Sequence, residues 1–301
     1  MKSISHKIET LRTATAEAWV LGPAPVLEAL LRGDTPKGNA VDVARIAGML
    51  AAKRTWELIP HCHPIPLDQV LVEIAAVEGK LRVEARVTAI WRTGMEMEAL
   101  TAATIAALTL YDIGKAMDAS LEISGVRLVE KTGGKSDYQE RIPESLRVAV
   151  LVTSDATHAG KREDKSGAYI QKRLRAFSLT PQTFLVLPDD QAAIAATLRQ
   201  WADEAYDLVL TTGGTGLGPR DVTVEATRSV IEREIPGIAE AMRAHGQRRT
   251  PYAMLSRGLI GVRGKTVIAN LPGSSRGVAE SMDAIFPALF HLYPMMRGGG
   301  H

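Results

Sequence analysis

The chain has 301 residues, 46% of them hydrophobic, and a formal net charge of +2. This length predicts two domains, because single cores rarely keep growing beyond about 250–300 residues. The small net charge disfavours nucleic acid as a partner. The single cysteine excludes an internal disulfide framework and fits a reducing compartment.

The chain shows no sign of export or membrane insertion. Its first residues are polar and charged, without the apolar core of a signal peptide. No run approaches the ~20 apolar residues that cross a bilayer. We therefore expect a soluble, cytoplasmic protein with no membrane partner.

Residues 1–140 are predicted to form the first domain, in which helical periodicity and strand alternation are combined. The pattern predicts helices over 41–54 and 99–117, paired antiparallel strands over 70–74 and 80–90 that turn at Glu78-Gly79, and another strand over 121–129. Strands grouped with helices on one side predict an α+β fold, an antiparallel sheet with helices of the ferredoxin-like kind.

Residues 131–146 interrupt this pattern with glycines, a proline and charges, and are predicted to be the linker. From 147 to 297 strands and helices alternate regularly. The predicted strands are 148–153, 183–187, 207–211 and 265–270, and the predicted helices are 167–177, 191–205, 223–233, 237–245 and 274–292. This order predicts an α/β second domain of three layers with a mostly parallel sheet.

Acidic and basic residues gather around the predicted helix 99–117. Glu96 and Glu98 would point to the same side of an extended segment, and Asp112 and Lys115 are neighbours on a helix. Considered singly, the first pair are ordinary helix-start carboxylates and the second an ordinary surface ion pair. Their combination in a helix rich in alanine and leucine predicts an acid/base site for an anionic substrate.

The segment His61-Cys62-His63, bracketed by Pro60 and Pro64, allows a second interpretation. Two imidazoles can share a zinc ion, but zinc sites need three or four protein ligands, and no second cluster supplies them. A buried structural histidine at His63 is the simpler alternative. A metal-dependent phosphohydrolase that uses His61 and His63 is the competing function.

Several longer motifs lie in the first half. They are Ala44-Arg-Ile-Ala-Gly, Ala52-Lys-Arg-Thr-Trp-Glu-Leu-Ile-Pro, Cys62-His-Pro, Met95-Glu-Met-Glu-Ala-Leu-Thr-Ala, Tyr111-Asp-x-x-Lys-Ala and Gly133-Gly-Lys-Ser. With these motifs the segment from about 5 to 137 closely resembles the MoaC family, the cyclic pyranopterin monophosphate synthases of molybdenum cofactor biosynthesis.

The resemblance implies that a 3′,8-cyclised dihydroguanosine triphosphate is converted into cyclic pyranopterin monophosphate with release of pyrophosphate. It implies no firm cofactor for this half, and a homo-oligomer, a hexamer built from dimers. The active-site positions that it implies are Lys37, His63, Glu96, Glu98, Asp112 and Lys115. The implied substrate contacts are Lys53, Cys62, Met95, Met97, Lys131 and Lys135.

The implied reaction suits these residue types. Lys37, Lys115 and Lys131 supply cations for the charge that develops as pyrophosphate leaves. Asp112 and Lys115 are the expected proton shuttles, because a cation beside a carboxylate tunes the pKa of both groups.

A glycine-rich segment, Gly213–Gly216, follows a predicted strand in the second half. Glycines there let backbone amides approach a phosphate closely, although the spacing matches neither a Walker loop nor a dinucleotide-binding loop. Asp189 and Asp221 follow predicted strands and can hold Mg²⁺ against a nucleotide. Capping of the next helix by Asp221 is the alternative.

The second half also carries Thr211-Thr-Gly-Gly-Thr-Gly, Pro219-Arg-Asp-Val-Thr, Glu234-Ile-Pro-Gly, Leu255-Ser-Arg and Asn270-Leu-Pro-Gly-Ser. In these motifs it resembles the MoaB/MogA family, whose members bind molybdopterin and whose active members adenylylate it with MgATP. The resemblance implies catalytic roles and Mg²⁺ binding for Asp189 and Asp221. The implied ligand contacts are Ser154, Asp155, Gly213, Gly214, Thr215, Gly216, Ser256, Pro272, Gly273 and Ser274.

The two resemblances together predict a bifunctional enzyme that serves an early and a late step of one pathway. The alternative keeps the first enzyme and makes the second half a non-catalytic module for pterin binding and assembly, because fold alone does not settle activity.

Overall fold

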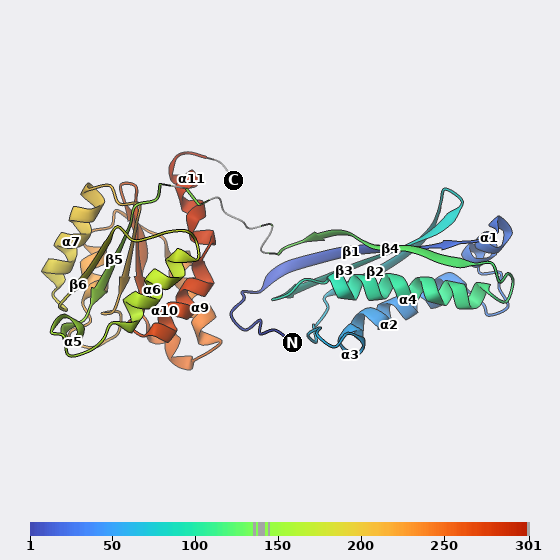
Figure 1. Cartoon of the computed structure of the whole chain (residues 1–301), viewed down its shortest axis with the longest axis horizontal. Helices are drawn as coiled ribbons and strands as arrows, with labels where there is room; N and C mark the ends of the chain where they lie inside the picture. Colours follow the sequence, from blue (N-terminus) through green and yellow to red (C-terminus); the bar gives the residue numbers. More distant parts are fainter. Residues whose placement is uncertain (135–136, 138–141, 144, 300–301) are drawn as a thin grey trace. The chain divides into compact units, whose positions relative to one another are not determined.

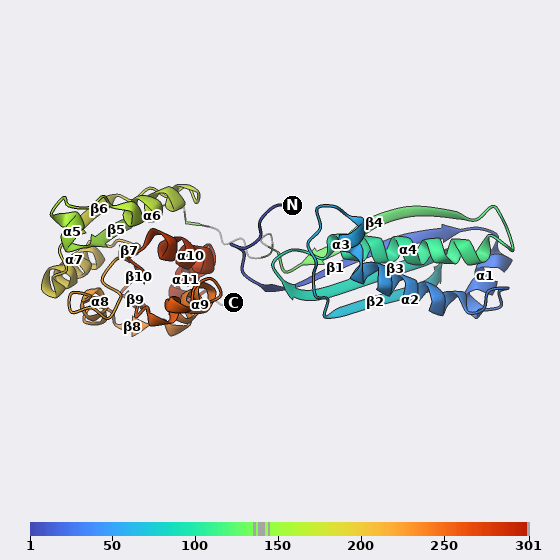
Figure 2. The ribbon, with the colours of Figure 1, turned by 90° about the horizontal axis from the view of Figure 1, so that it is seen from below.

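The computed structural model describes residues 1–134, 137, 142–143 and 145–299. The chain divides into two compact units, Met1–Tyr138 and Gln139–His301 (Figures 1 and 2). Lys135, a predicted substrate contact, lies outside the described residues, as does much of the predicted linker.

The first unit is built on a four-stranded antiparallel sheet in the order β2-β3-β1-β4. The strands are β1 (Thr10–Leu21), β2 (Gln69–Val77), β3 (Lys80–Trp91) and β4 (Glu122–Thr132). The predicted turn is confirmed, with φ of 50° at Glu78 and 74° at Gly79. Positive φ at both central residues is the geometry that suits a tight hairpin. Because β4 continues to Thr132, the predicted start of the linker at Lys131 is wrong.

The central strand β1 was not predicted from the sequence. It pairs with β3 on one side and β4 on the other. Its inward positions are Ala14, Ala16, Ala18 and Val20, all nearly inaccessible to solvent. Alanine has little strand propensity, so the alternation of this strand carries a weak hydrophobic signal.

Helices cover one face of this sheet (Figure 1). They are α1 (Ala24–Arg32), α2 (Ala40–Lys53), α3 (Thr55–Leu58) and α4 (Glu96–Gly114). The alanines of α4 and β1 lie in one buried cluster, so the long helix packs closely on the central strand. This arrangement confirms the predicted α+β class. Both predicted bounds of the long helix, 99 and 117, are wrong by three residues: Glu96 and Glu98 form its first turn, and it ends at Gly114.

The second unit has a six-stranded sheet in the order β6-β5-β7-β10-β9-β8. The strands are β5 (Val148–Thr153), β6 (Thr183–Leu187), β7 (Leu208–Thr212), β8 (Arg233–Glu234), β9 (Ile260–Arg263) and β10 (Thr266–Leu271). The first four strands of the sheet are parallel, and β9 and β8 extend it in antiparallel fashion. The mostly parallel sheet is as predicted, although β8 and β9 were not foreseen.

Two separate apolar clusters lie on the two faces of this sheet, which gives the predicted three layers. The helices are α5 (Asp155–His158), α6 (Lys165–Arg175), α7 (Gln191–Asp203), α8 (Thr223–Arg228), α9 (Pro236–Gln247), α10 (Ser275–Ile285) and α11 (Leu292–Met296), with short 3₁₀ turns η1 (Pro251–Leu255) and η2 (Ala288–His291). One cluster contains residues of α6, α9 and α10, and the other contains residues of α7 and α8.

Most predicted helices of this unit agree to within two residues at each end, but two were predicted several residues too long. The helix expected over 223–233 ends at Arg228, and Arg233 belongs to strand β8 instead. The helix expected over 274–292 ends at Ile285, where Pro287 cannot continue the hydrogen-bond pattern of a helix. Across the described residues, no helix is both long and apolar enough to span a bilayer.

Candidate functional sites

Helix α4 carries two acidic residues in its first turn, in different environments. Glu98 is 3% exposed, whereas Glu96 accepts an ion pair from Lys131 at 3.1 Å. The expectation that both carboxylates point to the same side is wrong, because residues two apart on a helix diverge. Met95, directly before the helix, is buried, and Met97 is exposed.

Burial dominates the electrostatics of Glu98. It raises the pKa of this carboxyl to about 7, against a backbone hydrogen bond that lowers the pKa, and the charge of Glu96 raises it further. The pKa of the Cys62 thiol is also raised, first by burial and then by the charge of Glu98. Glu98 is therefore poised to gain or lose a proton near neutral pH.

The other end of α4 holds a cluster of opposite charges. Asp112 accepts from Lys115 at 2.8 Å through Oδ1 and from Lys37 at 2.7 Å through Oδ2. Lys37 also donates to the backbone oxygen of Asp112 at 3.2 Å. The hydrogen bonds from Lys115 and Lys37 lower the pKa of Asp112 to about 2, and Asp112 in turn raises the pKa of Lys115.

The predicted first site is thus divided between the two ends of one helix. Fourteen residues separate Glu98 from Asp112 along α4, a rise of about 21 Å. Glu96, Glu98, Cys62 and Lys131 belong to the first group, and Asp112, Lys115 and Lys37 to the second. Within the described ranges, no hydrogen bond or ion pair joins Lys53 or Met97 to either group.

The histidine pair does not make a metal centre. A ring nitrogen of His63 contacts the backbone oxygen of Lys2 at 3.0 Å, and both His63 and His61 lie near or at the surface. In the part of the chain that the structure describes, no three His, Cys, Asp or Glu residues are grouped as metal ligands. The donor set therefore does not fit zinc, which needs at least three protein ligands.

In the second unit the predicted residues gather at the carboxyl edge of the parallel strands. Ser154 and Asp155 follow β5, Asp189 follows β6, and the glycine loop follows β7. Ser154 caps α5 by accepting from Thr157 N. The carboxyl edge is where open α/β sheets bind ligands.

Asp155 and Asp189 are locked together by their backbones. The amide of Asp155 donates to Asp189 Oδ2 at 3.0 Å, and the amide of Asp189 donates to Asp155 Oδ1 at 3.0 Å. Arg220 donates to both carboxylate oxygens of Asp155 at 2.9 Å. The sequence reasoning did not select Arg220, although it precedes Asp221 in a quoted motif.

The pKa of Asp189 is raised, first by burial and also by the nearby charges of Asp155 and Asp221, while hydrogen bonding to Asp155 and the charge of Arg220 oppose the rise. The negative charge of Asp221 thus disfavours the ionised form of Asp189. A cation between them would offset this effect. Mg²⁺ uses one or two carboxylates together with waters and substrate phosphates, so this pair fits a magnesium ion.

Asp221 does not cap the following helix. Its Oδ2 accepts from the amide of Gly218 at 2.8 Å, and the residue at the cap of α8 is Val222, with no side-chain cap bond. The capping alternative is therefore wrong.

Glycine is required where the loop after β7 turns. Gly213 and Gly214 have φ of 103° and 60°, a region that favours glycine. A Cβ at Gly213 would lie 2.1 Å from Thr153 O, and one at Gly214 would lie 2.2 Å from Thr223 Oγ1. The loop packs tightly on both neighbours, and Thr215 is buried.

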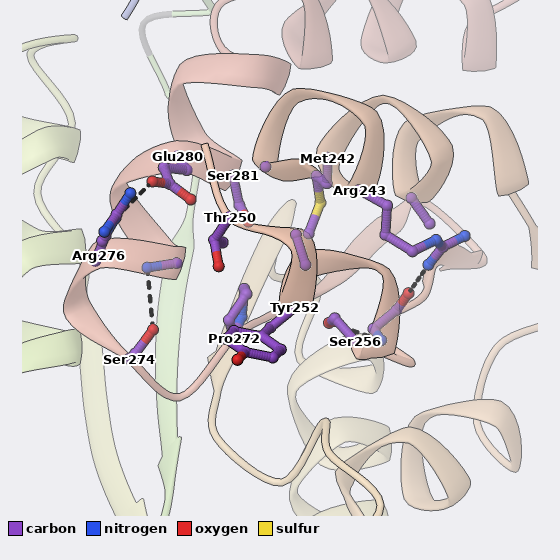
Figure 3. A pocket seen from close by; sticks show the side chains of 15 residues that line it. Met242, Arg243, Thr250, Tyr252, Ser256, Pro272, Ser274, Arg276, Glu280 and Ser281 are labelled. Carbon is purple, nitrogen blue, oxygen red and sulfur yellow. Dashed lines mark hydrogen bonds and ion pairs between the residues drawn. The ribbon is translucent and has the colours of Figure 1, made fainter. Parts of the chain in front are cut away.

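A cavity of about 320 Å³ lies among α9, η1 and α10 (Figure 3). Ser256, Pro272 and Ser274 line it, as do Tyr252 and Glu280, which sequence reasoning missed. Figure 3 shows Arg276 and Glu280 at one end and Arg243 and Ser256 at the other. A cavity of this size is within the range of small-molecule sites.

Asp189 and Asp221 do not line this cavity. Gly273 links the two regions, since a Cβ at this residue would lie 3.2 Å from Gly213 Cα. Thr212 Oγ1 also donates to Pro272 O at 2.7 Å. The carboxylates and the cavity are therefore adjoining parts of one strand-end region.

Comparison with protein families agrees with the division of the chain into two units. The MoaC family model matches residues 1–134, and the model described as a probable molybdopterin binding domain matches residues 149–291. A molybdenum cofactor biosynthesis bifunctional protein of Chlorobaculum tepidum is 40% identical over 301 residues, which are 100% of this chain and 96% of that protein.

Two further relatives match one half each. A cyclic pyranopterin monophosphate synthase of Deinococcus radiodurans is 51% identical over 147 residues, covering 48% of this chain and 88% of that protein. Among solved structures, the molybdopterin biosynthesis enzyme MoaB of Thermus thermophilus has 47% identity and a TM-score of 0.48, covering 51% of this chain and 97% of that chain.

Proposed function

Because this chain belongs to the family of bifunctional molybdenum cofactor biosynthesis proteins, we propose that each half catalyses its own reaction. The first half forms cyclic pyranopterin monophosphate and releases pyrophosphate from a cyclised dihydroguanosine triphosphate. The second half adenylylates molybdopterin. The residue pattern also supports a cytoplasmic location for both reactions.

The lysine–aspartate cluster at the end of α4 supports the first reaction. Lys37 and Lys115 already hold an oxyanion, the carboxylate of Asp112. A triphosphate substrate carries more negative charge than the Asp112 carboxylate. When the two lysines bind the phosphates instead, Asp112 is released. As the cyclic phosphate closes, a substrate hydroxyl gives its proton to the released Asp112 and attacks the α-phosphorus. The bond to the β-phosphate breaks, pyrophosphate leaves, and the lysines stabilise its charge.

Proton transfer in this half falls to Glu98 as well as to Asp112. While both lysines hold Asp112, its pKa of about 2 makes it a poor proton carrier at neutral pH. Glu98, with a pKa raised to about 7 by burial, suits a general acid or base. Ring opening and closure in the pterin need such a group.

The two ends of α4 lie too far apart to act on one small substrate within a single chain. A second copy of the chain solves this, because an antiparallel partner brings its own Glu98 end to the Asp112 end. An apolar row on α2 supports such pairing, since Val43, Ile46, Met49 and Leu50 are all exposed. The proposed assembly is a dimer or a hexamer made of dimers.

Complementation between two impaired variants tests the shared site. Glu98→Gln and Lys115→Ala chains are each expected to be strongly impaired alone, and co-expression regains part of the wild-type activity, because some mixed sites carry neither change. A mixture no more active than its parents would refute a site shared between copies. Size-exclusion chromatography with light scattering checks that mixed oligomers form.

In the second half, Asp189 and Asp221 would hold a magnesium ion, which would neutralise charge on the ATP phosphates. The glycine loop presents backbone amides to a phosphate, and the adjoining cavity beside Ser256 and Ser274 suits the organic part of the ligand. A phosphate oxygen of molybdopterin attacks the α-phosphorus of ATP, the bond to the β-phosphate breaks, and pyrophosphate leaves.

The hydrogen bonds that join Asp155 to Asp189 and to Arg220, the residue before Asp221, carry this proposal. The test is AMP transfer to molybdopterin by the full chain and by its Asp221→Ala variant. The wild type is expected to transfer AMP and the variant is not. Equal signals would leave the second half as a non-catalytic pterin-binding module.

A further inference from the structure

Arg257 lies beneath the glycine loop and makes four contacts with it and with the helix that follows. Its backbone amide donates to Thr215 O at 2.9 Å. Its Nε donates to Gly216 O at 2.7 Å, and its Nη2 donates to Asp221 O at 2.8 Å. Its third guanidinium nitrogen, Nη1, pairs with Glu225 of α8.

These contacts divide the polar groups of the loop into two sets. The carbonyl oxygens of Thr215, Gly216 and Asp221 are turned to Arg257. The amides of Gly214, Thr215 and Gly216 donate to no protein acceptor within the described residues. Amides with no partner at the carboxyl edge of a sheet are suited to bind an anionic ligand.

The guanidinium group is the side chain that can make these contacts at once. Its planar fork places separate donors on Gly216 O, Asp221 O and Glu225, and a lysine ammonium is a single point charge. By holding Asp221 O, the fork also fixes the backbone of the carboxylate proposed to bind Mg²⁺. Arg257 thereby fixes the spacing between the Asp221 carboxylate and the loop amides.

We propose that Arg257 is the positioning residue of the second site: it withdraws the loop carbonyls from the ligand, aims the amides at the phosphates and fixes Asp221. The assignment of the ligand as a polyphosphate rests on the proposed function. Arg257 itself does not touch the reacting atoms.

Arg257→Lys keeps the charge and loses the fork, so it is the principal test. Arg263→Lys is the matched control, because the two arginine side chains are 32% and 31% exposed and Arg263 likewise binds a backbone oxygen, Val230 O, and a carboxylate, Asp203. Arg263 lies on β9, away from the loop contacts described above. Both variants of the full chain are compared by thermal unfolding, to check that they fold equally well.

The measurements are the affinity for inorganic pyrophosphate with Mg²⁺, by calorimetry, and kcat for AMP transfer. Arg257→Lys should weaken pyrophosphate binding at least tenfold and lower kcat about 100-fold, the scale of a small misplacement of catalytic groups. Arg263→Lys should change neither. In Arg257→Ala, guanidinium ion at millimolar concentration should restore part of kcat, whereas methylammonium should not.

Equal pyrophosphate affinity and equal kcat in the two lysine variants would overturn the assignment of Arg257. If the wild type transfers no AMP but binds pyrophosphate, and Arg257→Lys weakens that binding, the positioning role of Arg257 is supported. Only the proposed adenylyl transfer is then refuted. A wild-type chain that binds no pyrophosphate would overturn both the positioning role of Arg257 and the proposed adenylyl transfer.

Discussion

The two halves of this chain are proposed to hold phosphate by different means. The first uses lysine side chains, Lys37 and Lys115, that are already paired with Asp112. The second offers backbone amides of the loop after β7, kept in place by Arg257. Side-chain cations can move with the substrate, whereas an amide cradle is fixed by the fold around it.

The carboxylates in the two halves show the same contrast. Asp112 is exposed to solvent between two lysines and its pKa falls to about 2, whereas burial raises the pKa of Glu98 and Asp189. Exposed pairing with cations keeps a carboxylate charged, and burial prepares it to bind a proton or a cation. The following predictions test these differences, from the largest expected effect to the smallest.

Removal of divalent cations should abolish the activity of the second half and leave that of the first half intact. With EDTA, AMP transfer should be abolished, because Asp189 and Asp221 would then repel the ATP phosphates. Formation of cyclic pyranopterin monophosphate should persist, since lysines neutralise the phosphates there. Both products are measured in the same reaction mixture, and restoration with excess Mg²⁺ is the control. Loss of cyclic pyranopterin monophosphate formation on chelation would contradict the claim that lysines alone neutralise the phosphates in the first half.

Replacement of Lys115 by alanine should lower cyclic pyranopterin monophosphate formation by about 1000-fold, because a cation that stabilises the leaving group is lost. The melting temperature should hardly change, since the Lys115 side chain is half exposed. Lys80→Ala, an exposed lysine at the β2–β3 turn, is the control. Turnover retained by Lys115→Ala would remove this residue from the site.

Glu98→Gln should lower kcat of the first half about 100-fold, the usual scale of general acid–base catalysis. It should also remove the limb of the pH–rate profile near pH 7 that the raised pKa of Glu98 predicts. Glu96→Gln, at a partly exposed position of the same helical turn, should keep that limb. A wild-type profile with no limb near pH 7 would argue against Glu98 as the proton carrier.

The same carboxyl should affect stability in a definite direction. Its folded-state pKa, about 7, is raised above the ordinary value of 4.5. The stability that it contributes is therefore full below pH 4.5 and is lost as the pH rises through 7. At pH 8, Glu98→Gln should stabilise the first unit by about 1–3 kcal/mol, as measured by urea unfolding. At pH 4 the variant should gain nothing, and an equal gain at both pH values would contradict the raised pKa.

Much of the fold was accessible from the sequence, because α2, β2, β3 and the β–α order of the second half have clear hydrophobic periods. The central strand β1 escaped prediction since alanines occupy its buried positions. Strands β8 and β9 were missed because they are two and four residues long. Their pairing, rather than their local sequence, defines them.

The sequence predicts which residues belong to the candidate sites better than it predicts how those residues are arranged in space. The contact between Asp112 and Lys115 follows from their spacing on a helix, but the partnership with Lys37 joins residues 75 positions apart. Nothing local indicates that Glu98 is buried while Glu96 is not. The roles of Arg220 and Arg257 depend on loops that meet only after the sheet has formed.

Independence of the two sites is best measured by assaying both reactions in two single variants of the full chain. Lys115→Ala should lower cyclic pyranopterin monophosphate formation by about 1000-fold and leave AMP transfer at the wild-type rate. Asp221→Asn should do the reverse. If either substitution lowered both activities, the two halves would not contain separate sites.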